Sequence, residues 1–224
     1  MGEGFFVTGT GTGVGKTVVA AVIARTWVRG ELRVGAFKPA VSGLGEAGEA
    51  DHELLRRAAA SYQSDDEIAP YRYEPPVSPH LGAELAGEEI DRQRLLEVAA
   101  RAARDADRLI AEGVGGLMVP LRRDYLVRDL ISDLALPVVV VADPSLGTIN
   151  HTLLTVEALE AVAAPIAALV LNPWPGEPGT VERSNHETLG ELTGLPILTL
   201  PRIDLDDPDA WPALDPPNPL ERLR

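Results

Sequence analysis

A glycine-rich segment near the start of the chain has the residues of a phosphate-binding loop. Between an apolar run and a helical pattern it reads Gly9-Thr10-Gly11-Thr12-Gly13-Val14-Gly15-Lys16-Thr17. In such a loop the backbone N–H groups converge on phosphate oxygens, and the following helix adds its positive dipole end. The lysine reaches the terminal phosphates, and the hydroxyl after it can ligate Mg²⁺. Five residues separate Gly9 from Gly15, where the strict pattern has four. A glycine turn without a ligand is the alternative, but strand, Gly-Lys-Thr and helix coincide here.

The lysines are the second chemical signal. Of the 20 basic residues only Lys16 and Lys38 are lysines, and all others are arginines. A compact ammonium fits sites where a wide guanidinium does not, and each lysine lies inside a motif. Lys38 begins the segment Lys38-Pro39-Ala40-Val41-Ser42-Gly43 after a second apolar run, at the expected carboxyl end of a strand. It could neutralise a transferring phosphoryl group, and Ser42 could hydrogen-bond a substrate. The alternative is a surface lysine before a turn.

Two acidic residues, Asp51 and Glu112, could complete a metal site. Mg²⁺ prefers oxygen ligands and keeps several waters, so one or two carboxylates with Thr17 and phosphates suffice. Glu112 ends an apolar run and precedes Gly113-Val114-Gly115-Gly116, where the backbone can approach a ligand closely. Asp51 precedes a helical run, so it could instead be an N-cap, and Glu112 could be an exposed residue at a turn.

The elements that must position these residues follow an alternating pattern. Short apolar runs alternate with longer amphipathic ones, which predicts a single-domain α/β fold over 1–224: a doubly wound, mostly parallel sheet with helices on both faces. The clearest strand is 137–142, apolar on both faces as a central parallel strand should be. We expect strands at 5–7, 33–37, 109–112, 137–142, 166–171 and 196–200, and helices at 16–29, 51–60, 91–106, 126–134, 148–163 and 181–193.

Three segments give no clear pattern. Residues 41–50 are rich in glycine and are expected to be mobile, and 61–90 carry several prolines and little periodicity. The Pro- and Asp-rich tail at 204–224 is expected to be loosely attached.

Composition limits the class of protein. The chain has 224 residues, 45% of them hydrophobic, no cysteine and a formal net charge of -14. The absence of cysteine excludes disulfides and thiol nucleophiles and fits a cytoplasmic protein. The acidic balance argues against nucleic-acid and membrane partners, so any bound anion requires a local positive site. No apolar run is long enough to span a bilayer, and the N-terminus lacks the pattern of a signal peptide.

Together these motifs resemble those of the dethiobiotin synthetase family. The most specific are Lys-Pro-x-x-Ser-Gly at 38–43, Glu-Gly-x-Gly-Gly at 112–116 and Gly-x-x-Asn-His at 147–151, with further matches at Asp51, 78–80 and Asn172. The resemblance implies a P-loop ligase of biotin synthesis. Such an enzyme adds CO₂ to an amine of 7,8-diaminononanoate, phosphorylates the carbamate with ATP, and closes the ureido ring with release of ADP and phosphate.

The resemblance also implies the role of each residue. Lys16 and Lys38 would be catalytic, beside the γ-phosphate and the carbamate. Mg²⁺ would be held by Thr17, Asp51 and Glu112. The nucleotide would lie against Thr12, Gly13, Val14, Gly15, Lys16 and Thr17, with its base near Asn172, Pro201, Arg202 and Ile203. The substrate would contact Thr12, Lys38 and Ser42 at its amine end, and Gly147, Thr148, Ile149 and Asn150 at its carboxylate. In the family that last segment comes from the other subunit, which implies a homodimer with the active site at the interface.

Three rival classes stay open at this point. A regulatory ATPase of the MinD/ParA kind would carry a signature lysine where this chain has Gly11. The sequence also lacks a basic amphipathic C-terminal helix with which such a protein could bind a membrane. Amide-forming ligases such as the cobyrinate amidases need a cysteine nucleophile, which this chain lacks. A pure binding module would have no need for two lysines and two carboxylates at one edge.

Overall fold

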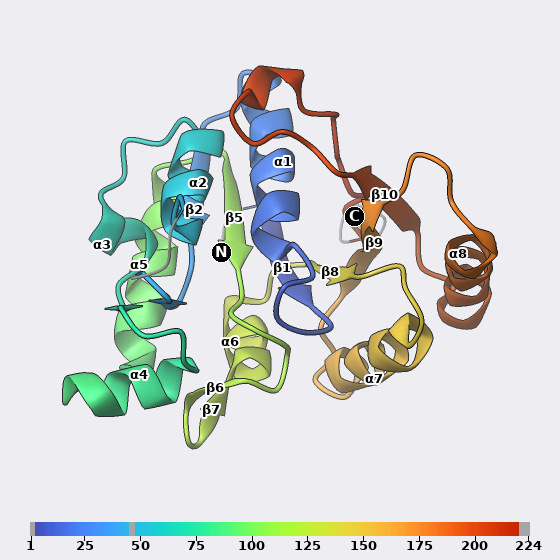
Figure 1. Cartoon of the computed structure of the whole chain (residues 1–224). Coiled ribbons are helices and arrows are strands. Elements are labelled where there is room, and N and C mark those ends of the chain that lie inside the picture. Colours follow the sequence, from blue (N-terminus) through green and yellow to red (C-terminus); the bar gives the residue numbers. More distant parts are fainter. Residues whose placement is uncertain (1–2, 45–47, 220–224) are drawn as a thin grey trace.

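A six-stranded parallel sheet in the order β10-β9-β8-β1-β5-β2 forms the centre of the molecule (Figure 1). The structure is a computed structural model that describes residues 3–44 and 48–219. The strands are β1 (Gly4–Gly9), β2 (Val34–Phe37), β5 (Arg108–Glu112), β8 (Val138–Ala142), β9 (Ile166–Trp174) and β10 (Ile197–Pro201). The predicted doubly wound sheet is therefore confirmed, with the strand at 137–142 in its interior.

The strands are apolar because helices cover both faces of the sheet. Successive side chains of a strand point to opposite faces, so Phe6 belongs to one buried cluster and Phe5 and Val7 to the other. In β8 the same alternation divides Val140 from Val139. Burial on both sides favours uninterrupted apolar runs over the polar-apolar alternation of a half-exposed strand.

Six main helices form the outer layers. On one face lie α1 (Lys16–Arg29) and α2 (Asp51–Ala58), and on the other lie α5 (Arg92–Arg104), α6 (Val127–Leu134), α7 (Thr148–Glu160) and α8 (Thr180–Thr193). Among residues 3–44 and 48–219, no helix is long and apolar enough to cross a membrane.

Smaller elements occupy the region between β2 and β5. Residues 61–90, which showed little periodicity, form α3 (Asp65–Ile68), β4 (Arg72–Tyr73) and α4 (Pro79–Ala86). The short strand β3 (Val41–Ser42) pairs with β4. Further along, β6 (Pro120–Arg122) pairs with β7 (Tyr125–Leu126). The segment 41–50, expected to be mobile, includes residues 45–47, which lie outside the described residues.

Asp51 is the first residue of α2 and not its N-cap. Ala50 holds the N-cap position, and its backbone N–H donates to Glu53 Oε2 at 3.0 Å. The capping interpretation of Asp51 is thus wrong, because Asp51 already lies inside the helix and the residue before it holds the cap position. The side chain of Asp51 is left available for other contacts. The helix expected at 91–106 begins with a side-chain cap, since Asp91 Oδ1 accepts a hydrogen bond from Gln93 N at 2.8 Å.

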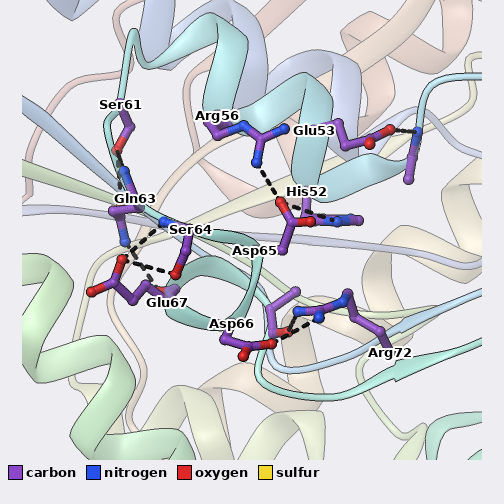
Figure 2. Close-up of polar contacts among 12 residues, drawn as sticks. His52, Glu53, Arg56, Ser61, Gln63, Ser64, Asp65, Asp66, Glu67 and Arg72 are labelled. Carbon is purple, nitrogen blue, oxygen red and sulfur yellow. Dashed lines mark hydrogen bonds and ion pairs between the residues drawn. The ribbon is translucent and has the colours of Figure 1, made fainter.

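A polar corner fixes α2 and α3 against the edge strand of the sheet (Figure 2). Asp65 lies between Arg56, with which it forms an ion pair, and His52 Nε2 at 3.7 Å. The side-chain amide of Gln63 pairs with β2, accepting from Ala36 N at 2.8 Å and donating to Ala36 O at 3.0 Å. This amide takes the place of another strand at the edge, and Asp65 joins α3 to α2 beside it.

The described part of the C-terminal segment, residues 204–219, packs against α1. In Figure 1 the red segment that follows β10 crosses the far end of α1. There Arg29 donates hydrogen bonds to the carbonyl oxygens of Pro208, Asp209 and Trp211. The side chains of Trp211 and Leu214 are 3% and 7% exposed and join the cluster that contains α1. The content of proline and aspartate predicts a loosely attached tail. In the structure, Trp211 and Leu214 pack on α1, and Arg29 of that helix bonds the segment.

Replacing Trp211 with alanine should therefore destabilise the fold. We expect the free energy of unfolding to fall by about 3 kcal/mol, because a buried indole and its packing are lost. Urea unfolding followed by circular dichroism measures the change. Tyr62→Ala is the control, since Tyr62 is 105% exposed and its removal should cost less than about 0.5 kcal/mol. Equal stability of the Trp211→Ala variant and the unmodified chain would contradict the attachment.

Candidate active site

The register of the parallel strands brings the residues predicted for catalysis and metal binding to one edge of the sheet. β1 lies between β5 and β8, and Val7 is the register partner of Glu112. β2 lies on the other side of β5, where Phe37 is the partner of Ala111. Lys38 therefore emerges beside Glu112, and the glycine-rich loop begins beyond the end of β1. This is where the chain reverses its direction of winding, the usual position of a ligand site in open α/β sheets.

The glycine-rich loop has the conformation its sequence predicts. Gly13 and Gly15 have φ angles of 78° and 87°, in the left-handed region that favours glycine. Gly15 is the N-cap of α1, with no side-chain cap, so the first amides of this helix stay available. Lys16 is buried, and its Nζ donates to Gly11 O at 2.8 Å. The ammonium is thus held over its own loop.

Lys38 is the centre of a buried ionic cluster. Its side chain is 2% exposed, and Nζ lies 2.6 Å from Glu112 Oε1 and 2.9 Å from Asp51 Oδ2. Gly113 O accepts from the same nitrogen at 3.3 Å. The hydroxyl of Thr17 donates to Glu112 Oε1 at 2.7 Å. Residues from the ends of β2 and β5 and from the starts of α1 and α2 meet here, as the sequence predicted for Lys38, Asp51, Glu112 and Thr17.

Burial and neighbouring charges change the pKa values in this cluster. Burial alone would lower the pKa of Lys38, but the carboxylates of Glu112 and Asp51 raise it, so this ammonium remains charged. Burial lowers the pKa of Lys16. Burial raises the pKa of Glu112 against the opposing effect of Lys38. The pKa of Asp51 is lowered, because Lys38 outweighs the effect of burial. The cluster thus places two lysine side chains beside two carboxyl groups, with the Lys38 ammonium held between Glu112 and Asp51.

The oxygen atoms of the cluster fit a magnesium ion. Glu112 is fully buried, yet its Oε2 has no hydrogen-bond partner among the described residues. Buried polar atoms normally have a partner, so this oxygen is suited to a ligand. Within residues 3–44 and 48–219 no three His, Cys, Asp or Glu side chains form a metal site. The donor set of Thr17, Asp51 and Glu112 suits Mg²⁺, which takes its remaining ligands from phosphates and water.

A second glycine loop runs alongside the first. A Cβ added to Gly116 would lie 3.6 Å from Gly11 Cα, and one on Gly115 would lie 3.5 Å from Thr12 Oγ1. The segment after Glu112 therefore packs against the phosphate-binding loop, and at Gly115 a φ of 62° and a distance of 2.8 Å from an added Cβ to Val119 Cγ2 favour glycine. Thr12 is exposed at the point where the two loops meet.

Asn172 also contacts the glycine-rich loop. Its side chain is buried, and Nδ2 donates to Val14 O at 3.0 Å. A Cβ on Gly15 would lie only 2.0 Å from the same nitrogen. The end of β9 is thereby joined to the phosphate-binding loop.

The other predicted site residues lie at the same edge but outside this cluster. Ser42, in β3, is half-buried opposite Tyr73. Pro201, Arg202 and Ile203 end β10 and continue from it, whereas Gly147 to Asn150 begin α7. In the described part of the chain, no hydrogen bond or ion pair joins these segments to the lysine cluster. Sequence reasoning also missed Asn185, a buried polar residue of α8 that bonds the turn before α7. An asparagine inside an amphipathic helix gave no signal of this role.

Cavity size does not identify the site. A cavity of about 690 Å³ lies at the amino-terminal half of the edge strand, beside Val34, Gly35 and Tyr62. None of the predicted site residues lines it. The chemical cluster, and not the volume, marks the candidate active site.

Comparison with known proteins agrees with the motifs. A family profile described as an AAA domain matches residues 3–207. The ATP-dependent dethiobiotin synthetase BioD of Bacillus subtilis (strain 168) is 38% identical over 197 residues, which cover 88% of this chain and 85% of that protein. The protein of the same name from Thermodesulfovibrio yellowstonii is 40% identical over 210 residues, covering 88% of each chain.

Solved structures show the same fold at lower identity. A ParA family ATPase from Chlorobium tepidum TLS has a TM-score of 0.57 and 14% identity, covering 92% of this chain and 88% of that chain. That likeness concerns the fold alone, whereas the sequence relatives extend over most of the chain. This chain belongs to the ATP-dependent dethiobiotin synthetase family.

Proposed function

We propose that this protein is a dethiobiotin synthetase that uses ATP to close the ureido ring of dethiobiotin on 7,8-diaminononanoate and CO₂. The observation that carries the proposal is the buried cluster in which Lys38 contacts Glu112 and Asp51 beside the phosphate-binding loop. Family membership supplies the substrate class, and the cluster supplies the means to stabilise phosphoryl transfer.

The reaction needs charge stabilisation more than a protein nucleophile. One substrate amine attacks CO₂ and loses a proton to give a carbamate. A carbamate oxygen then attacks the γ-phosphorus of ATP, and ADP leaves. The second amine attacks the carbamoyl carbon, phosphate leaves, and the cyclic urea forms. The nucleophiles belong to the substrate, so the protein's task is to position anions and to offset their charge.

The two lysines suit this task. Lys16 follows the glycine-rich loop, where a lysine contacts the β- and γ-phosphates. Lys38 is held by Glu112 and Asp51, and Thr17 bonds the same oxygen of Glu112. We assign Lys38 to the carbamate and the transferring phosphoryl group, with Thr12 and Ser42 at the substrate's amine end. An ammonium fixed in advance by carboxylates needs little reorganisation in the transition state.

Thr17, Asp51 and Glu112 would hold Mg²⁺. When bound, the ion offsets charge on the β- and γ-phosphate oxygens. The unpartnered Glu112 Oε2 supports this assignment. In the same arrangement Asn172 would lie at the nucleotide base, with Pro201, Arg202 and Ile203 completing its pocket.

The substrate carboxylate would bind at the start of α7, against Gly147, Thr148, Ile149 and Asn150. A helix N-terminus offers free amides and a positive dipole end to an anion. By the family's pattern this segment comes from the partner subunit, so we propose a homodimer with the active site at the interface. The exposure of Leu146 (91%) and Leu154 (57%) near this helix start supports a contact there.

The proposed reaction predicts a specific dependence of phosphate release. With Mg²⁺-ATP, the purified protein should release phosphate only when both bicarbonate and 7,8-diaminononanoate are present, and chelation of the metal should stop the release. A coupled phosphate assay measures this, and mass spectrometry identifies dethiobiotin. Release that continues without the diamine would contradict the proposal and indicate a regulatory ATPase.

Lys38→Arg should lower turnover by about 100-fold, because the guanidinium keeps the charge but cannot place it in the position of the ammonium. Steady-state kinetics with the diamine measures the change, and thermal unfolding checks that the variant is folded. The surface variant Arg123→Lys is the control, since Arg123 is 82% exposed and its turnover should be unchanged. Near-normal turnover of a folded Lys38→Arg variant would exclude the assigned role.

Gly15→Ala should weaken Mg²⁺-ATP binding by about 10-fold or more, because the added Cβ displaces Asn172 and distorts the loop. Isothermal titration calorimetry measures the affinity. Gly194→Ala is a matched control, since Gly194 has a φ of 64° and nothing within 4 Å of an added Cβ. Both variants carry the left-handed strain of about 1–2 kcal/mol, but only Gly15→Ala should lose nucleotide. Equal affinities in the two variants would show that the contact with Asn172 is not required.

A further inference from the structure

The turn between β8 and α7 has a defined set of free amides. Gly147 is the N-cap of α7, with a φ of 98° and no side-chain cap. The N–H of Thr148 donates to Ser145 O at 3.2 Å. Throughout residues 3–44 and 48–219, no hydrogen bond engages the N–H groups of Gly147, Ile149 or Asn150. Three amides at the positive end of a helix are thus available to an anion.

Two hydroxyl groups in the first turns of α7 strengthen this interpretation. Thr148 and Thr152 are 5% and 0% exposed, and neither hydroxyl has a hydrogen-bond partner within the described ranges. Buried hydroxyls are rarely left without a partner. Their presence beside free amides is an independent sign that this helix start accepts a polar ligand.

Asn185 of α8 holds this turn in place. Its side chain is 7% exposed, and Nδ2 donates to Pro144 O at 2.9 Å and to Ser145 O at 3.1 Å. Asp143 Oδ1 accepts from Ser145 N at 2.8 Å on the other side of the turn. Ser145 O accepts from both Asn185 and the Thr148 amide. The side chain of Asn185 is therefore bonded to the same carbonyl that orients the first amide of α7.

We propose that Asn185 is a positioning residue for the substrate carboxylate, acting through the turn 143–147 that sets the direction of the α7 amides. This inference rests on the proposed function, in which the α7 N-terminus binds that carboxylate. Asn185 itself touches no substrate. It fixes the geometry of the anion site from a separate helix.

The chemistry of the side chain explains why an asparagine is needed. The amide nitrogen donates two hydrogen bonds, and both go to carbonyl oxygens of the turn. An aspartate would place a negative charge against two acceptors and near the bound carboxylate. A leucine would leave the carbonyl of Pro144, which is buried, without its donor.

The test compares two substrates that differ only at the carboxylate. The first is 7,8-diaminononanoate, and the second is 2,3-diaminononane, which keeps both amines and replaces the carboxylate with a methyl group. In the Asn185→Ala variant, KM for the diamino acid should rise by about 10-fold or more, because the amides are misaligned. The KM values for 2,3-diaminononane and ATP, and kcat with the diamino acid, should change less than about 2-fold, since neither amine nor phosphate contacts this turn.

Two further variants control for folding. Thr193→Ala removes hydrogen bonds from the same helix, to Leu189 O at 2.6 Å and from Leu195 N at 3.2 Å, and should leave every KM unchanged. Asn185→Ser keeps one hydrogen-bond donor and should give an intermediate KM for the diamino acid. This variant provides the test if the alanine variant fails to fold. Thermal unfolding is measured for each.

The outcomes separate the inference from the proposed function. An unchanged KM for the diamino acid in folded Asn185 variants would overturn the role of Asn185 while leaving the reaction intact. An equal rise in KM for 7,8-diaminononanoate, 2,3-diaminononane and ATP would also overturn that role, because the effect would then not be specific to the carboxylate. If the unmodified protein consumes neither 7,8-diaminononanoate nor 2,3-diaminononane, the proposed function is overturned, and the inference with it.

Discussion

The ion pair between Lys38 and Glu112 is the interaction on which the rest of the site depends. Both side chains are buried, with 2.6 Å between Nζ and Oε1, and Asp51 and Thr17 complete the contacts. Burying a charge costs free energy unless the charge is paired. Removing one partner of a buried ion pair leaves the other charge uncompensated, which lowers the free energy of unfolding by about 3–5 kcal/mol. The pair therefore has two consequences. It holds the ends of β2 and β5 at a fixed distance from α1 and α2, and it keeps a cation in position before any substrate arrives.

This pairing follows from parallel register. A parallel sheet places the carboxyl ends of its strands at one edge, and Val7 opposite Glu112 sets how far β5 extends beside the glycine-rich loop. A shift of one residue would turn Glu112 to the other face of the sheet. The covering helices on both faces fix that register through burial. The ionic site is thus a product of the apolar packing beneath it.

Outside the cluster, the site depends on contacts between segments far apart in sequence. Asn172 at the end of β9 bonds Val14 in the glycine-rich loop, and Asn185 of α8 bonds the turn before α7. Each is a buried amide that satisfies backbone carbonyls, so each fixes loop geometry at little conformational cost. The described C-terminal segment is bonded to α1 in a similar way, because Arg29 of that helix donates to the carbonyl groups of Pro208, Asp209 and Trp211. The loops at this edge of the sheet are held by side chains of the neighbouring elements.

The sequence by itself determined the fold class and the family, and it indicated Lys38, Glu112 and Thr17 as residues of the site. Apolar runs with a period suited to buried strands predict the sheet, and Gly-Lys-Thr, Lys38 and Glu112 follow strands whose ends must meet. Only the tertiary structure decided that Asp51 lies beside Lys38 instead of capping α2, that residues 204–219 pack on α1, and that Asn185 supports α7. The physical reason is that local patterns record burial and turn chemistry, whereas a hydrogen bond between distant segments leaves no periodic trace. A polar residue in an amphipathic helix has the same appearance in sequence whether it faces water or a buried carbonyl group.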